Sequence, residues 1–110
     1  MLVGILDALL AEDEAIRAVA VFDDLGSLVV HTNVAEFDEE AFLRIVRAWR
    51  AASSDVSPAR ELRIEGPDHA FVARAVGPAL VAADCDTAAP LGRIALRLRL
   101  LHDPILGALP

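Results

Sequence analysis

The feature that most restricts the fold of this 110-residue chain is the order in which its hydrophobic patterns follow one another. Apolar residues recur either at helical spacing or in the short dense and alternating runs that are typical of strands. The expected elements are a helix over 2–10, strands over 16–22 and 27–32, a helix from 38 to about 53, strands over 60–65, 69–76 and 78–83, and a helix from 90. A chain of this length has room for one hydrophobic core, so we predict a single domain, residues 1–110.

The helix from residue 38 carries the strongest local signals. Asp38 is a preferred N-cap residue, and Glu39 and Glu40 place negative charge at the positive end of the helix dipole. Its apolar positions follow at i, i+3, i+4 and i+7: Phe42, Ile45, Val46 and Trp49. The helix should end near residues 53–55, because Pro58 prevents it from continuing.

The strands differ in how they alternate. Residues 60–65 alternate charged and apolar side chains, which predicts a strand with one solvated face at the edge of a sheet. The two runs that follow are nearly uncharged apart from Arg74, as expected for strands covered on both faces. Between the first two strands, Asp23 and Gly26 supply the residue types of a tight turn.

The last segment fits two patterns. Residues 96–100 alternate as a strand would, but the apolar positions from 91 to 101 also fit a helix. The abundance of Leu, Ala and Arg favours the helix, with Pro90 at its first position and Thr87 or Ala89 as the preceding cap. Pro104 should end or kink this helix. The apolar tail 104–110 either packs back on the domain or meets a partner.

Composition limits the classes of partner. The formal net charge is −7, and binding to nucleic acid or to anionic lipid needs a basic face. We therefore expect no nucleic-acid partner. No apolar run approaches the roughly 18 residues of a transmembrane helix, and no basic leader precedes the apolar start, so we expect no membrane insertion. The single cysteine, Cys85, cannot form an internal disulfide, and these features together predict a cytoplasmic protein.

No pattern in the chain predicts a catalytic, cofactor-binding or metal-binding site. Asp84 and Asp86 flank Cys85, and their charge disfavours the thiolate that a nucleophile requires. We therefore interpret Cys85 as a half-buried structural residue. The glycines are isolated, so no phosphate-binding loop is expected. None of the three histidines has metal-ligand spacing, and surface or capping roles are favoured: His31, His69 and His102.

Arginines recur every three residues on the helix from residue 38. Arg44, Arg47 and Arg50 are interpreted first as a solvated face. The alternative is an edge that binds a partner, since Arg is enriched in protein interfaces. Trp49 lies in a register that places it in a core or an interface.

Two segments resemble the roadblock family, which comprises dynein light chain relatives and includes bacterial regulators of small GTPases. Residues 18–30 resemble the opening hairpin of that family, in which a strand runs into Asp-x-x-Gly and returns, here Asp23 to Gly26. Residues 90–96 resemble the start of its last helix, where Leu91-Gly92 precedes apolar residues and Arg93. The element order resembles the family over nearly the whole chain.

The resemblance implies an α+β, profilin-like fold with three α/β/α layers around a five-stranded antiparallel sheet. The first and last helices would cover one face and the second helix the other. It also implies a homodimer in which third strands join edge to edge and second helices lie side by side. The implied interface residues are Leu43, Arg44, Arg47, Ala48, Arg50, Ala51, Leu62, Arg63 and Ile64.

The function implied by the resemblance is a non-catalytic regulator or scaffold that binds a Ras-like small GTPase and modulates its nucleotide cycle. It leaves open whether such a regulator accelerates hydrolysis, promotes exchange or only scaffolds. The alternative is a small-molecule sensor with a PAS- or GAF-like sheet, which requires a cavity of about 300 Å³. An enzyme built on His31, Asp84 and Cys85 is a third and improbable hypothesis.

Overall fold

The protein is described by a computed structural model that covers residues 1–32, 35, 37–53 and 60–110. Its elements are α1 (Leu2–Glu12), β1 (Ile16–Phe22), β2 (Leu28–His31), α2 (Glu39–Ala52), β3 (Glu61–Glu65), β4 (Ala70–Val76), β5 (Ala79–Cys85), α3 (Leu91–Leu100) and α4 (His102–Ala108). The predicted order of helices and strands is confirmed, and α4 is an addition to it. None of the helices in these ranges is long and apolar enough to span a membrane.

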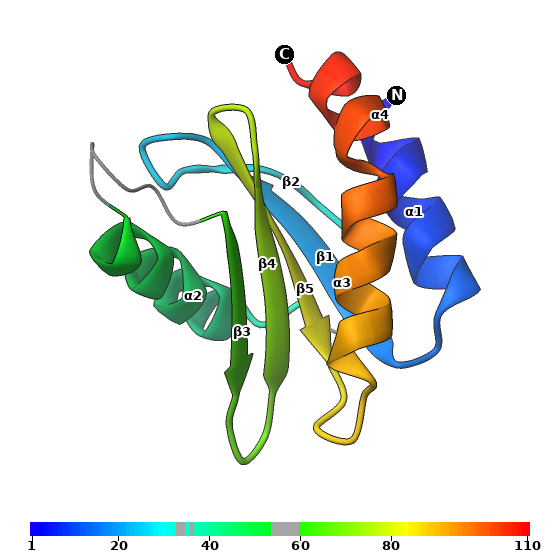
Figure 1. Ribbon diagram of the computed structural model, residues 1–110, viewed down its shortest axis with the longest axis vertical. Coiled ribbons are helices and arrows are strands. Elements are labelled where there is room, and N and C mark those ends of the chain that lie inside the picture. Colours follow the sequence, from blue (N-terminus) through cyan, green and yellow to red (C-terminus); the bar gives the residue numbers. More distant parts are fainter. Residues whose placement is uncertain (33–34, 36, 54–59) are drawn as a thin grey trace.

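The five strands form one antiparallel sheet in the order β2-β1-β5-β4-β3 (Figure 1). The alternating strand β3 lies at the edge of the sheet, as predicted, and the nearly uncharged strands β4 and β5 lie inside it and are covered on both faces. Strand β5 runs two residues further than the sequence pattern indicated. It includes Asp84 and Cys85 because both residues pair with β1 and β4.

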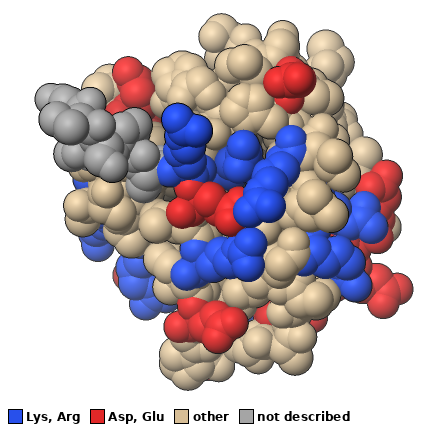
Figure 2. Space-filling model, viewed as in Figure 1, with Lys and Arg blue, Asp and Glu red and all other residues tan. Residues whose placement is uncertain are grey.

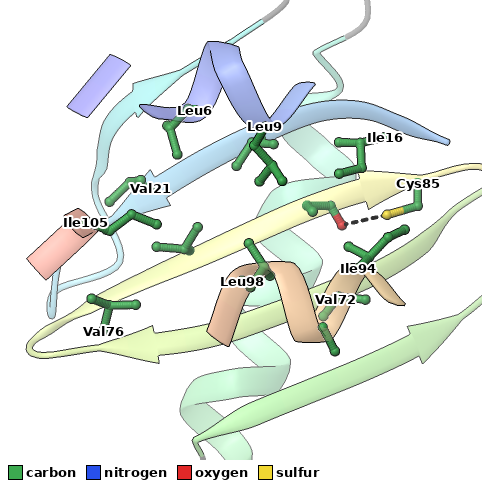
Figure 3. Close-up of a cluster of buried hydrophobic side chains, with 14 of the residues drawn as sticks. Leu6, Leu9, Ile16, Val21, Val72, Val76, Cys85, Ile94, Leu98 and Ile105 are labelled. Carbon is green, nitrogen blue, oxygen red and sulfur yellow. Dashed lines mark hydrogen bonds between the residues drawn. The ribbon is translucent and has the colours of Figure 1, made fainter. Parts of the chain in front are cut away.

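The helices cover the sheet in the predicted three-layer arrangement. Helices α1, α3 and α4 lie on one face and α2 on the other (Figure 1). The core on the first face joins Leu6 and Leu9 of α1 to Ile94 and Leu98 of α3 across the inner strands (Figure 3). The core on the second face packs Phe42 of α2 against Phe71 of β4. The three inner strands, β1, β5 and β4, are thus buried on both faces, whereas the edge strands β2 and β3 are partly exposed.

The signals read for α2 are confirmed. The carboxylate of Asp38 accepts a hydrogen bond of 3.1 Å from the backbone N–H of Ala41, which caps the helix. Of the predicted stripe, Phe42, Ile45 and Val46 are buried, and Trp49 packs against the same core while only partly buried. The helix ends at Ala52, while Pro58, which was expected to stop it, lies outside the described residues.

The ambiguous closing segment is a helix, but both prolines differ from expectation. Pro90 is the N-cap of α3 rather than its first residue. Pro104 neither ends nor kinks α3, which stops at Leu100; it lies in the first turn of α4, where a missing N–H costs no hydrogen bond. Ile105 is fully buried among α1 and α3 residues, so the tail packs back on the domain.

The turn between β4 and β5 depends on a glycine in the left-handed region. Gly77 has φ of +56°, and a Cβ placed there would lie 2.7 Å from Cδ1 of Leu106 in α4. We expect Gly77→Ala to destabilise the protein by about 1–2 kcal/mol, because an L side chain is strained at this φ. Chemical denaturation of both proteins measures the difference.

Gly107 is the matched control for that substitution. It lies in α4, one residue after the Leu106 that Gly77 approaches, and an added Cβ there would meet nothing within 4 Å. Gly107→Ala should therefore leave stability unchanged or raise it by up to about 1 kcal/mol. If Gly77→Ala were equally harmless, the left-handed conformation of the turn would be wrong.

Candidate interaction surface

The predicted interface residues lie on two neighbouring elements. Six belong to α2 and three to β3. The exposed ones are Arg44, Arg47, Arg50, Ala51 and Arg63. The partly buried ones are Leu43, Ala48, Leu62 and Ile64.

A surface groove of about 340 Å³ brings three of these residues together. Arg44 and Ala48 line it from α2 and Ile64 lines it from β3. Its remaining lining is mainly apolar and comes from α2 and from the β3–β4 hairpin: Ala41, Ile45, Gly66, Pro67, Asp68, His69 and Phe71. The groove therefore offers an apolar surface with Arg44 at its rim.

The free edge of β3 lies beside this groove. Just before β3, the carbonyl of Arg60 accepts a hydrogen bond from the N–H of Ala75, and just after it the N–H of Gly66 donates to the carbonyl of His69. Because hydrogen-bonded pairs alternate in an antiparallel ladder, the even-numbered residues of β3 are the ones whose main-chain groups bond β4. The main-chain groups of Glu61, Arg63 and Glu65 consequently point away from β4. No strand of the described residues pairs with this edge of β3, so it can accept another strand.

Arg50 has a local structural role. Its Nη1 donates a hydrogen bond of 2.9 Å to the carbonyl of Leu25 in the β1–β2 turn. Asp23 supports the same turn by accepting from the N–H groups of Leu25 and Ser27 at 3.0 and 2.8 Å. Among hydrogen bonds between described residues, Arg50 is therefore the α2 arginine held against its own chain.

Arg63 lies in a cluster that sequence reasoning did not assemble. Glu61 is within 3.3 Å of Arg63 and 3.7 Å of Arg74, and Arg99 of α3 binds both its oxygens at 3.1 Å. Figure 2 shows basic side chains surrounding acidic atoms near the centre of the side of the molecule that it presents. Burial acts to raise the pKa of Glu61, but the hydrogen bonds and charges of Arg99 and Arg63 outweigh it and lower that pKa.

A second unpredicted group links α2 to the sheet. His69 Nδ1 lies 2.9 and 3.0 Å from the two carboxylate oxygens of Asp84, and Nε2 lies 3.3 Å from Oδ2 of Asp38. The side chain of Asp84 is completely buried. His69 is thus half-buried between the cap of α2 and the sheet. The sequence-based interpretation of His69 as a surface or cap residue did not include its contact with the buried carboxylate of Asp84.

Burial raises the pKa of Asp84 above its ordinary value of 3.8, although the hydrogen bond and charge of His69 act in the opposite direction. A carboxyl group whose folded-state pKa is raised contributes stability below the unfolded-state pKa. That contribution is lost as the pH rises through the folded-state value. The pH dependence of stability therefore reports on this buried group.

We expect the loss of stability on ionisation of Asp84 to be visible when two variants are compared, His69→Gln and His69→Gln/Asp84→Asn. Both lack the imidazole, so they differ only in the carboxyl group. The stability of the first variant relative to the second should fall as the pH rises from 3.8 through the raised pKa, and then level off. Urea unfolding at several pH values measures the difference. A difference that stays constant, or that grows with pH, would contradict a raised pKa.

The cysteine is unsuited to nucleophilic catalysis. Burial, together with the charges of Asp84, Asp13 and Asp86, raises the pKa of the Cys85 thiol to about 12. The side chain is fully buried, more than expected, and its Sγ donates to the carbonyl of Ala83. His31 lies on β2, which β1 separates from β5, so the structure does not bring the three residues of the enzyme hypothesis together.

Two further functional hypotheses can be compared with the geometry. Within the described ranges, no group of three or more His, Cys, Asp or Glu could hold a metal ion.

The groove reaches the volume of about 300 Å³ that a sensor requires, so volume alone does not exclude the small-molecule sensor hypothesis. The groove lies between α2 and the β3–β4 hairpin and includes exposed residues such as Arg44 and Pro67.

Comparison of the sequence with known proteins finds no match: no protein-family profile and no curated protein matches the chain. Comparison of the structure is informative. MglB, a gliding protein of Thermus thermophilus, superposes with a TM-score of 0.77 at 17% identity, covering 94% of this chain and 84% of that chain. A roadblock/LC7 domain from Streptomyces avermitilis superposes with a TM-score of 0.74 at 10% identity, covering 93% and 92%.

The chain has the roadblock/LC7 fold. A second structure of MglB, in a tetrameric arrangement, gives a TM-score of 0.78 at 17% identity. Profilin of Schizosaccharomyces pombe gives a lower score of 0.69 at 11% identity over 98% of each chain. The roadblock fold of this chain is therefore also profilin-like, as the resemblance implied.

Proposed function

We propose that this protein is a non-catalytic regulator that forms a homodimer, binds a Ras-like small GTPase and modulates its nucleotide cycle in the cytoplasm. Support for the regulatory role comes from the roadblock fold, which this chain shares with the gliding protein MglB. Support for self-association comes from MglB in a tetrameric arrangement. The observation that carries the proposal is that the open edge of β3 adjoins the apolar groove beside α2.

The edge and the groove can both be covered by one partner surface. A second β3 would satisfy the main-chain groups of Glu61, Arg63 and Glu65, and a second α2 would cover the groove. Ala48 at the groove allows close approach of another helix. An interface of standard size buries roughly 800 Å² on each side, which one helix and one strand can supply.

The charges of α2 suit an antiparallel pair of these helices. Its first turn holds Glu39 and Glu40, and Arg44, Arg47 and Arg50 follow towards its end. In an antiparallel pair each acidic turn faces the basic half of the other helix, whereas a parallel pair places like charges together. The exposed Arg47 is the group best placed to meet the partner's glutamates.

We expect Ala48→Glu to convert the dimer into a monomer. The substitution puts a charge at the centre of the groove, where a partner would have to bury it unpaired. Ala48 is only half-buried, so the fold tolerates the change. Light scattering after size-exclusion chromatography should show the mass halved.

Ala8 supplies the matched control for this substitution. It is an exposed alanine on α1, on the opposite side of the sheet. Ala8→Glu adds the same charge and should leave the mass unchanged. A wild-type protein that is monomeric at micromolar concentration would refute the dimer.

The regulatory half of the proposal is tested with small GTPases from the source organism. Each is loaded with GTP, and hydrolysis and nucleotide release are followed with and without the protein. Binding with a change in either rate supports the proposal, and binding without a change indicates scaffolding. Failure to bind any of them would overturn it.

The groove also favours the sensor hypothesis to a limited degree, because a small molecule could occupy the same surface. The two hypotheses differ in what fills the groove. If a metabolite bound to the groove and Ala48→Glu abolished its binding without changing the mass of the protein, the sensor function would be correct.

A further inference from the structure

We infer that the outer face of α3 and the arginines beside it form a docking site for an acidic, amphipathic segment of a partner protein. We call this site the α3 face and define it by Leu96, Leu100, Arg63, Arg74 and Arg99. It is distinct from the α2 groove, and it goes beyond the proposed GTPase regulation.

Two leucines give the α3 face its apolar part. Leu96 and Leu100 are 52% and 72% exposed, although α3 buries Leu91, Ile94, Ala95 and Leu98 on its other side. Residues four positions apart lie one above the other on a helix, so these leucines form a ridge. One turn earlier, Arg63 reaches α3 beside Gly92, where its Nη1 would lie in ordinary van der Waals contact, at 4.0 Å, with a Cβ at that position.

The arginines give the α3 face its charge. Arg63, Arg74 and Arg99 share one carboxylate, that of Glu61, and Arg74 Nε is buried with no hydrogen-bond partner among the described residues. A guanidinium group has five donors, whereas one carboxylate has about four acceptor positions. Arg63 and Arg99 are 44% and 48% exposed, so they keep donors available to an outside acceptor.

The sign of the charge selects the occupant. The whole chain carries a net charge of −7, yet these residues leave an excess of positive charge around Glu61. At physiological salt, charges interact over about 8 Å, so a narrow acidic segment meets the three arginines together with Glu61 and the exposed Glu65, which follows Arg63 on the same face of β3 and leaves a smaller positive excess there. A broad anionic membrane would face the net negative charge as well, which favours a protein segment.

The α3 face stays open in the proposed dimer. The side chains of Leu62 and Ile64 face the core beneath α2, so those of Glu61 and Arg63 lie on the α3 side of the sheet. Pairing of two β3 edges uses main-chain groups and extends the sheet without covering this side. Both sites can therefore be occupied in the same assembly.

The test uses two synthetic helical peptides with the same leucine positions, one carrying Glu and the other Lys at its polar positions. Binding to the full-length protein is followed by fluorescence anisotropy and by the NMR signals of the leucine methyl groups. We expect the Glu peptide to bind, to shift the signals of Leu96 and Leu100, and to weaken as salt is raised. The Lys peptide should bind at least tenfold more weakly.

Variants locate the site. Leu96→Ser/Leu100→Ser and Arg99→Gln should each weaken the Glu peptide by tenfold or more, and both are exposed changes that leave the fold intact. Arg47→Glu on α2 should leave binding unchanged, even if it disrupts the dimer, so the two proposals fail separately. The inference is overturned if the Glu peptide does not bind, if the α3 variants bind it normally, if the Lys peptide binds equally, or if only anionic phosphatidylglycerol vesicles bind.

Discussion

His69→Phe should destabilise the folded protein by about 3 kcal/mol at neutral pH. The substitution keeps an aromatic ring beside Phe71. In the folded protein the ring of His69 stacks on that of Phe71, with the two ring centroids 5.7 Å apart. The substitution removes both hydrogen bonds to the completely buried carboxylate of Asp84. Asp84 must then either remain charged without a partner or take up a proton, and both cost free energy at pH 7. Urea denaturation measures the loss.

The double variant His69→Phe/Asp84→Leu separates this cause from a general packing defect. It removes the buried carboxyl group together with its hydrogen-bond partner, and an apolar pair of this kind is often as stable as the buried polar pair it replaces. We expect it to recover most of the lost stability. A double variant as unstable as His69→Phe would show that the ring position itself, and not the orphaned carboxylate, is responsible.

Ile105→Ala should cost about 2–5 kcal/mol, which makes the C-terminal helix a part of the core rather than an appendage. Ile105 is fully buried between α1 and α3 residues, so the substitution leaves a cavity in the cluster of Figure 3. The same denaturation experiment measures this change.

Leu100→Ala is the control for that prediction. Leu100 lies five positions earlier and is 72% exposed, so truncating it should change stability by no more than about 0.5 kcal/mol. Equal effects of the two substitutions would mean that α4 does not pack as described.

The element order could be predicted because each element carries a local signal. Asp38 caps a helix, residues 60–65 alternate, and the neutral runs that follow belong to buried strands. The tail was not assigned because Pro104 marks a helix end as readily as a helix start. Only the packing of Ile105 on α1 and α3 distinguishes them.

The candidate site was predictable only in part, for a related reason. Resemblance pointed to α2 and β3, but the two clusters found in the structure depend on which strands are neighbours. His69 meets Asp84 because β4 pairs with β5 in a particular register, and Arg99 meets Glu61 because α3 packs over β4, the strand that pairs with β3. Residues 15 and 38 positions apart carry no periodic signal of such contacts. The nine interface residues remain predictions.

The central pairing of β1 with β5 has a consequence for folding order. The ion pair of Arg17 and Asp86 at the end of that pairing joins groups 69 positions apart in the chain. Closing such a long loop is entropically costly and slows folding. During synthesis the apolar strand β1 leaves the ribosome long before its inner neighbour exists, with only the short β2 to shield one edge. The sheet can therefore be completed only after Cys85 has emerged.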